Sequence, residues 1–201
     1  GYNIDEIFSC SYEEICHLFL FGKLPNPTQL SSLCKRMKRV RMLPEPVKNF
    51  IRKAPANDEP MSVLRTAVSM LSGYMDNLAD TSRDSLIENS IGLISKFATI
   101  AAAICRVRNG GDIIDPNSEF GHAENFLWMS SGQKPPDVVA RTLDTSLVLH
   151  ADHSFNASTF TARVVISSMS DIVSAIVAAI GSLKGPLHGG ANTAVMKMLL
   201  E

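Results

Sequence analysis

The chain has 201 residues, of which 45% are hydrophobic and 19% are charged. This composition excludes a disordered segment, because so much apolar surface can form a core. Nineteen lysines and arginines nearly balance 20 aspartates and glutamates, which gives a net charge of -1. This charge does not favour binding to nucleic acid or to an acidic membrane. A small polar substrate is compatible with it.

The apolar stretches are too short to cross a membrane. The longest ones, residues 97–105 and 172–183, fall below the roughly 18 to 20 residues that a spanning helix needs, so we expect buried helices and no membrane contact. No charged segment followed by an apolar one opens the sequence, so no secretory signal is expected. Four cysteines without a C-x-x-C pair indicate reduced thiols. We therefore expect a cytoplasmic protein.

Helical patterns follow one another through the first half of the chain. Ser11 and Glu14 form a capping box that opens a helix ending before Gly22. A second helix is predicted to begin at Thr28 and to end before Pro44, with apolar residues on one side and basic residues on the other. Two further helices and a polar loop are predicted over residues 46–51, 61–75 and 76–84, respectively.

The second half of the chain is also helical. A helix of about six turns is predicted over residues 85–108, and its small residues at 98–103 favour close packing against a neighbour. Ser118 is predicted to cap the next helix, which ends before Gly132. Further helices are predicted over residues 137–153, 158–168 and 171–183, and from residue 191 onward. No segment alternates long enough to indicate a strand, so we predict an all-α bundle with short connections.

Two segments place histidines beside short polar side chains. In the first, residues 149–159, a helix that continues to residue 153 would put His150 and His153 on one face. One interpretation is capping, in which a histidine shields a helix end while Asn156 and Ser158 cap the next helix. The alternative is a metal site, since two imidazoles on one face can be ligands. No third ligand stands at a recognised spacing, so we expect no metal.

The second segment, residues 185–192, has glycines on both sides of His188. Glycines let a ligand approach the backbone, and the first turn of a following helix would present free N–H groups that favour negative charge. Because that helix end disfavours an imidazolium, we expect His188 to be a neutral hydrogen-bond donor to a carbonyl, able to stabilise an enol. An incidental histidine in a glycine-rich turn is the alternative.

Together the two segments resemble the citrate synthase family. L-H-A-D-H-x-x-N-A-S-T at residues 149–159 and K-G-P-L-H-G-G-A-N at residues 184–192 are similar to two of its motifs, also in the distance between them. Residues 1–6, residues 18–25 and H-A-E-N-F-L at residues 122–127 are similar as well, so the resemblance covers nearly the whole chain. It implies an all-α homodimer that condenses oxaloacetate with acetyl-CoA to citrate and CoA, without a further cofactor.

The resemblance also implies roles for single residues. His188 would be catalytic and would donate a hydrogen bond to the thioester carbonyl oxygen while a carboxylate removes a methyl proton. His153 and Asn156 would bind oxaloacetate. Ser158 would orient the catalytic imidazole and so fix its tautomer. His150 is expected to give structural support only.

The sequence departs from the family pattern at a few positions. Ser154 and Phe155 stand where many members have an acidic and a polar residue, and Thr193 replaces a common glutamate. The family's catalytic aspartate, another oxaloacetate histidine and the substrate-binding arginines lie beyond the part that this chain resembles. The resemblance thus implies a partial large domain over residues 1–201, without the small domain. We expect the chain alone to be essentially inactive, because one acid–base group contributes about 100- to 10,000-fold.

Other functions remain open at this level. A 2-methylcitrate synthase would use propionyl-CoA on the same scaffold, and one methylene changes binding by only about 1 to 3 kcal/mol. A citryl-CoA lyase is a more distant alternative. A non-catalytic helical interaction module could instead use a basic helix face against an acidic partner or RNA, although no aromatic side chains interleave to stack bases. That face consists of Lys35, Arg36, Lys38, Arg39 and Arg41.

Overall fold

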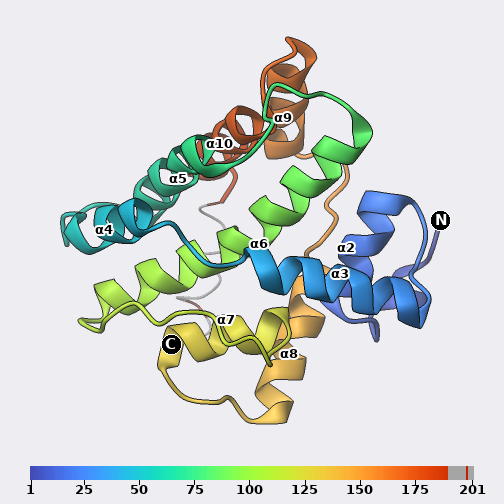
Figure 1. Cartoon of the computed structure of the whole chain (residues 1–201), viewed down its shortest axis with the longest axis horizontal. Coiled ribbons are helices and arrows are strands. Elements are labelled where there is room, and N and C mark those ends of the chain that lie inside the picture. The colour runs from blue at the N-terminus through green and yellow to red at the C-terminus, as the bar shows by residue number, and fades with distance from the viewer. Residues whose placement is uncertain (190–197, 199–201) are drawn as a thin grey trace.

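The computed structural model describes residues 1–189 and residue 198, and every regular element in that part of the chain is a helix (Figure 1). This confirms the predicted all-α class. The elements are α1 Ile4–Ile7, α2 Tyr12–Phe21, α3 Pro27–Val40, α4 Glu45–Lys53, α5 Pro60–Met70, the 3-10 turn η1 Leu71–Tyr74, α6 Arg83–Arg108, α7 His122–Ser131, α8 Asp137–Leu149, α9 Ala157–Ser167 and α10 Ile172–Leu183.

Helix α6 runs through the middle of the bundle and contacts α3, α4, α5, α7 and α10 (Figure 1). On one side α9 packs along α10, which packs on α5, while on the other side α8 packs on α7 and α2. The main core joins α4, α5, α6 and α10 through buried residues such as Val47, Val68, Ile100 and Ile180. Each such side chain stabilises the fold by roughly 1.5–3 kcal/mol through burial.

Local capping explains where the first helices begin and end. Ser11 accepts a hydrogen bond from the backbone N–H of Glu14, and Glu14 accepts one from the backbone of Ser11 at 2.7 Å, so the predicted capping box is confirmed. Gly22 ends α2 in the left-handed conformation, with φ of 78°. Helix α3 begins at Pro27, one residue before the predicted start, because Asn26 caps it.

Helix α8 ends at Leu149, so the prediction of a helix through residue 153 is wrong. The ring Nδ1–H of His150 donates to the carbonyl of Ser146 at 2.7 Å and closes the helix end. Asp152 then accepts from the backbone N–H of Ser154 at 2.9 Å, and Ser154 has a φ of 50°, which no helix allows. His150 and His153 therefore do not share a helix face.

Helix α7 begins at His122 rather than near Ser118. The hydroxyl of Ser118 bonds to the side chain of Glu119 and caps no helix. The carboxylate of Glu13, on α2, accepts from the backbone N–H of His122 at 2.8 Å and satisfies one of the free donors of the first turn. The start of α7 is thus determined by Glu13, a residue of α2 that lies 109 residues earlier in the sequence.

The remaining differences from the predicted bounds are small. Helix α5 ends at Met70 and continues as the turn η1, and α6 begins at Arg83 after the cap of Ser82. The short helix α1 has no counterpart among the predictions. Helix α9 begins one residue before the predicted start. The helix predicted from residue 191 onward lies outside the described residues.

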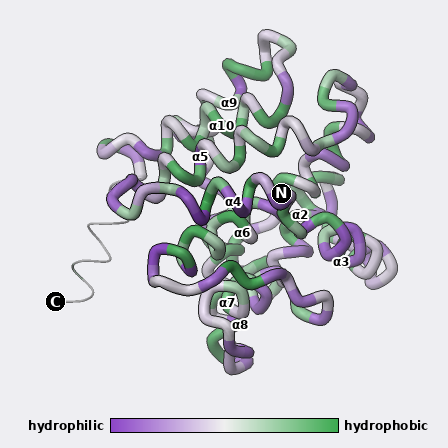
Figure 2. The backbone as a smooth tube through the Cα atoms, turned by 60° about the vertical axis from the view of Figure 1, so that its left-hand side comes forward, coloured by the Kyte–Doolittle hydropathy of each residue, from purple (hydrophilic) through white to green (hydrophobic). Residues whose placement is uncertain are grey.

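Hydrophobic residues gather along the inner helices, whereas α3 and the outer connections carry much of the hydrophilic chain (Figure 2). Within the described part, α6 is the one helix that is long and apolar enough to span a membrane by length and composition, and half of its most apolar stretch is buried. A single helix of this kind is weak evidence for a membrane span, because the core helix of a folded domain can have the same length and composition. All four cysteines are described and are free thiols.

Candidate functional site

The structure joins the two histidine-containing segments through Ser158 and His188. Ser158 lies in the first turn of α9, and His188 lies in the turn that follows α10. The Ser158 hydroxyl is 2.8 Å from Nε2 of His188 and also donates to the carbonyl of Ala179 on α10, at 3.1 Å. A single hydroxyl therefore connects α9, α10 and the turn that carries the imidazole.

The backbone of that turn holds the half-buried His188 in place. The N–H of His188 donates to the carbonyl of Gly185 at 3.0 Å, and the N–H of Gly189 donates to the carbonyl of Leu183 at 3.0 Å. A Cβ atom on Gly189 would overlap the carbonyl oxygen of Leu183. Glycine is required at residue 189 because only a residue without a side chain allows the chain to turn back this closely.

Asn156 is the cap of α9. Its Oδ1 accepts from the backbone N–H of Thr159 at 3.0 Å, which confirms the capping interpretation for this residue. The cap uses only the side-chain oxygen, so Nδ2 can still donate to a ligand. The role of Asn156 in substrate binding stays a prediction.

His153 lies exposed in the turn between α8 and α9, a few residues before Ser158. Contacts before and after His153 hold this turn in place. Asp152 accepts from the backbone of Ser154, and the ring of Phe155 lies 5.0 Å below the guanidinium of Arg163, a residue of α9. Phe155 also meets Phe160 edge-on, with ring centroids 5.6 Å apart. The backbone that carries His153 is thereby anchored to α9.

The described residues contain no group of three histidine, cysteine, aspartate or glutamate side chains that could hold a metal ion. The separation of His150 from His153 by the end of α8 removes the geometry on which the metal interpretation rested. The predicted site residues lie around the N-terminal end of α9. Ser158 and His188 are in contact, and His153 and Asn156 lie at the N-terminal end of α9.

Sequence reasoning missed a group of buried and partly buried ionisable side chains around the start of α2. The carboxylate of Asp144 accepts from the backbone N–H of Tyr12 at 3.2 Å. Burial raises the pKa of Asp144 from 3.8 to about 6, against the lowering effect of this hydrogen bond. Burial lowers the pKa of His122 from 6.5 to about 4, although the charge of Glu13 opposes it. Only the tertiary packing of α2 on α7 and α8 creates this group.

The predicted basic face of α3 is largely engaged within the molecule. Arg41 is buried and donates to the carbonyl of Phe120, and Lys38 donates to the carbonyl of Glu119. Arg36 forms an ion pair with Glu88 on α6. Lys38 and Arg41 thus connect the C-terminal end of α3 to the segment before α7, and Arg36 connects α3 to α6. Three of the five basic side chains therefore have partners within the protein, whereas Lys35 and Arg39 are exposed.

The chain is similar to known proteins of one family. The family model described as citrate synthase, C-terminal domain, matches residues 1–201. The chain is 43% identical to citrate synthase 2 of Bacillus subtilis over 100% of this chain and 55% of that protein. It is 39% identical to a 2-methylcitrate synthase of Mycobacterium tuberculosis, over 100% of this chain and 51% of that protein.

Solved structures agree with these matches. The crystal structure of citrate synthase from Pyrobaculum aerophilum aligns with a TM-score of 0.92 and 37% identity, over 96% of this chain and 51% of that one. The complex of the Thermoplasma acidophilum citrate synthase with carboxymethyl coenzyme A and oxaloacetate aligns with a TM-score of 0.92 and 30% identity, over the same shares. The chain spans about half the length of these relatives, and it belongs to the citrate synthase family.

Proposed function

We propose that this chain forms part of the active site of a citrate synthase, which condenses acetyl-CoA with oxaloacetate to citrate and CoA. In this proposal His188 polarises the thioester carbonyl, and His153 and Asn156 bind oxaloacetate. The observation that supports it best is the 2.8 Å contact between Ser158 and His188, which joins the two motif segments and fixes the imidazole. Family membership and the relatives named citrate synthase support the same reaction.

The hydrogen bonds of Ser158 decide which nitrogen of His188 can donate. A carbonyl only accepts, so the hydroxyl that donates to Ala179 must accept from Nε2–H of His188. A neutral His188 then has a lone pair on Nδ1. If the Ser158 hydroxyl donates to Nε2 instead of to Ala179, the ring proton of the neutral His188 lies on Nδ1. The Nδ1–H group can then donate to a thioester carbonyl. The catalytic role therefore requires this rotation of the Ser158 hydroxyl, or an imidazolium.

The reaction also needs a base that removes a methyl proton from acetyl-CoA. The family's catalytic aspartate lies outside the part that this chain resembles, and the chain spans about half the length of its relatives. A polarised carbonyl without a base does not lose its proton at a useful rate. We therefore propose that the 201 residues alone release CoA from acetyl-CoA at a negligible rate.

A second candidate is 2-methylcitrate synthase, which uses propionyl-CoA. Relatives with this name match the whole chain at 39% identity, close to the 43% of the citrate synthase from Bacillus subtilis. One extra methylene in a pocket changes the free energy of binding by only about 1–3 kcal/mol. The ratio of kcat/KM for the two acyl-CoAs, measured on a polypeptide with the complete fold, separates the two candidates.

We further propose a homodimer in the cytoplasm. The family resemblance supports the dimer, and four free thiols suit a reducing compartment. Sedimentation of the chain at micromolar concentration tests the first part, and a species that remains monomeric there contradicts it.

Oxaloacetate binding tests the proposed site without requiring activity. We expect oxaloacetate to raise the melting temperature of the chain, because a ligand that binds only the folded state stabilises it. His153→Ala should abolish this rise. His150→Ala is the matched control, since His150 closes α8 with its own ring and should leave the response to oxaloacetate intact. An equal rise in the wild type and in His153→Ala contradicts the proposed role of His153.

A further inference from the structure

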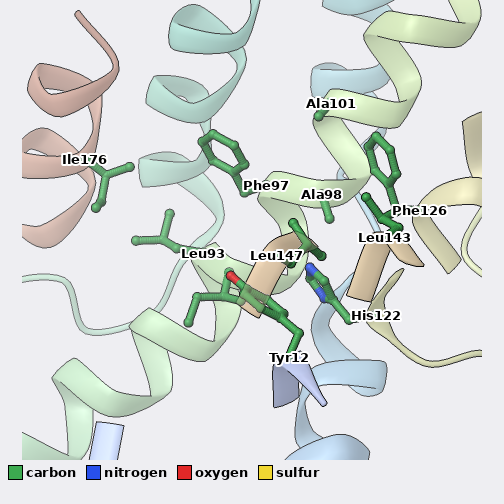
Figure 3. Close-up of a pocket in the computed structure, with 11 residues that line it drawn as sticks. Tyr12, Leu93, Phe97, Ala98, Ala101, His122, Phe126, Leu143, Leu147 and Ile176 are labelled. Atoms are coloured by element: carbon green, nitrogen blue, oxygen red, sulfur yellow. The ribbon is translucent and has the colours of Figure 1, made fainter. Parts of the chain in front are cut away.

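A polar pocket lies between α2 and α3. This pocket, called here the α2–α3 pocket, has a volume of about 390 Å³ and opens to solvent. One face of α3, the C-terminal half of α2 and the turn between the two helices line it. Its hydrogen-bonding side chains are His17, Lys23, Gln29, Ser32 and Arg36. The pocket beside α6 is different, because apolar side chains form most of its wall (Figure 3).

His17 is buried but keeps one ring nitrogen open to the α2–α3 pocket. Its Nδ1–H donates to the carbonyl of Lys23 at 2.8 Å, because a carbonyl can only accept. Every inaccessible side-chain nitrogen of the described residues has a hydrogen-bond partner, whereas Nε2 of His17 has none among them, so Nε2 is accessible from the pocket. The ring of Phe21 packs against the imidazole, with ring centroids 4.5 Å apart. The imidazole is thus held with Nε2 available to a ligand.

Two cationic side chains line the α2–α3 pocket. Arg36 donates from Nη2 to the carboxylate of Glu88 on α6, which leaves Nε and Nη1 for a ligand. Lys23 is exposed, and its flexible side chain can bring the ammonium to a ligand in the pocket. No aspartate or glutamate is among the described residues that line the pocket. The pocket therefore favours an anion.

Neutral donors and an apolar wall complete the α2–α3 pocket. Oε1 of Gln29 accepts from the backbone N–H of Asn26 at 3.0 Å, so the amide Nε2 of Gln29 can donate to a ligand. Ser32 lies one turn further along the same face of α3 and adds a hydroxyl. Phe21 and the buried Leu33 form the apolar wall, against which the carbon atoms of a ligand can pack.

We propose that the α2–α3 pocket binds the phosphate group of a small phosphate monoester. A phosphate group offers three acceptor oxygens, and arginine and lysine are the side chains that bind it best. Nε2 of His17 can accept from a phosphate P–OH when the ring is neutral and can donate when the ring is charged. The volume of about 390 Å³ is typical of pockets for small organic ligands, which favours a monoester over free phosphate. This inference does not depend on the roles of His153 and His188.

Titration calorimetry at constant ionic strength tests the proposal with two probes, phenyl phosphate and inorganic phosphate. It is carried out on the 201-residue chain and on a polypeptide with the complete citrate synthase fold. We expect both probes to bind both polypeptides, and phenyl phosphate to bind at least about threefold more tightly because its ring can pack on Phe21. Equal affinities contradict a monoester as the ligand. Binding to the chain alone, without binding to the complete fold, overturns the proposal, because the other half would then cover the pocket.

Charge-removing variants show which side chains hold the phosphate. Lys23→Gln and Arg36→Gln should each weaken the binding of phenyl phosphate at least about tenfold, because each removes a charge-assisted hydrogen bond. Lys35→Gln is the matched control, since it removes the same charge from an exposed position of α3 outside the pocket, and it should leave the affinity nearly unchanged. Glu88→Gln releases Arg36 from its ion pair and should strengthen binding. Unchanged affinity in both Lys23→Gln and Arg36→Gln overturns the proposal.

Proton NMR of the histidine rings shows where phenyl phosphate binds. The Hε1 signal of His17 should move during the titration, whereas that of His150, whose ring closes α8, should stay in place. Movement of the His153 or His188 signal without movement of the His17 signal overturns the proposal, because the probe would then bind near the proposed oxaloacetate and thioester site. That result leaves the proposed function intact, so the two proposals can fail separately.

Discussion

The hydroxyl of Ser158 and Nε2 of His188 lie 2.8 Å apart although 30 residues separate them in the chain. The contact exists because α9 and α10 pack along each other and because the chain turns sharply after α10. It places one hydroxyl between the imidazole and the carbonyl of Ala179. Ser158, a residue of α9, therefore influences which ring nitrogen of His188 carries the proton.

Replacement of Ser158 by alanine tests that control. Without a hydroxyl to accept from Nε2–H, the population of the Nδ1–H tautomer of His188 should rise. Nitrogen-15 NMR of the imidazole measures the two tautomers directly. Ser154→Ala removes an exposed hydroxyl in the turn before α9 and serves as the control. An unchanged tautomer ratio in Ser158→Ala means that the serine does not govern the ring.

Two glycine substitutions should have opposite effects on stability. Gly189→Ala forces the new Cβ atom against the carbonyl of Leu183 and should cost about 1–3 kcal/mol of unfolding free energy. Gly181→Ala, on α10, meets nothing within 4 Å and should add roughly 0.5–1 kcal/mol, because alanine loses less backbone entropy in a helix. Urea unfolding measures both. A neutral effect of Gly189→Ala would show that the turn holding His188 is looser than described.

Asp144 and His122 should oppose each other in the pH dependence of stability. The folded pKa of Asp144 is raised to about 6, so its contribution is present at low pH and is lost as the pH rises toward 6. The folded pKa of His122 is lowered to about 4, so its contribution is present above 6.5 and is lost as the pH falls toward 4. In the wild type the two contributions largely cancel between these limits.

Single substitutions separate the two contributions. In Asp144→Asn only the histidine remains, and the free energy of unfolding should rise with pH between about 4 and 6, by up to about 1.4 kcal/mol per pH unit. In His122→Gln only the carboxyl remains, and the same free energy should fall with rising pH. Denaturant titrations at several pH values measure the slopes. Slopes of equal sign in the two variants would contradict the assignment.

The contact between Arg163 and Phe155 should matter for oxaloacetate, since it anchors the turn that carries His153. Phe155→Ala removes the ring that meets both Arg163 and Phe160, and we expect a smaller rise in melting temperature with oxaloacetate. Phe155→Tyr keeps the ring and should restore most of the effect. An oxaloacetate response of Phe155→Ala equal to that of the wild type shows that the turn needs no anchor.

Much of the fold could be predicted from local signals. The capping box of Ser11 and Glu14 predicts where α2 begins, and Gly22 predicts where it ends. The sequence alone is therefore sufficient to predict the bounds of α2. The start of α7 could not be predicted, because the donor at His122 is satisfied by Glu13 from a different helix. The apolar pattern does not indicate the end of α8, because the turn that follows depends on the contact of the Asp152 side chain with the backbone of Ser154.

The candidate site was predictable to a similar degree. The resemblance to the family pointed to Ser158 and His188, and the structure brings them into contact. Neither motif indicated that the Ser158 hydroxyl also donates to Ala179, because that contact depends on how α9 packs on α10. The hydrophobic pocket beside α6 was not predictable either, since its eleven lining residues come from the five helices α2, α6, α7, α8 and α10.

In the proposed reaction His188 polarises the thioester carbonyl. The most direct test of this role uses a polypeptide in which this chain is joined to the remaining half of citrate synthase 2 from Bacillus subtilis. The rate of CoA release from acetyl-CoA and oxaloacetate is measured on this joined polypeptide. We predict that His188→Ala lowers kcat by at least about 100-fold while the KM for oxaloacetate changes little, because a donor to a developing oxyanion contributes that much. A kcat within a few-fold of the parent polypeptide would contradict the catalytic role of His188.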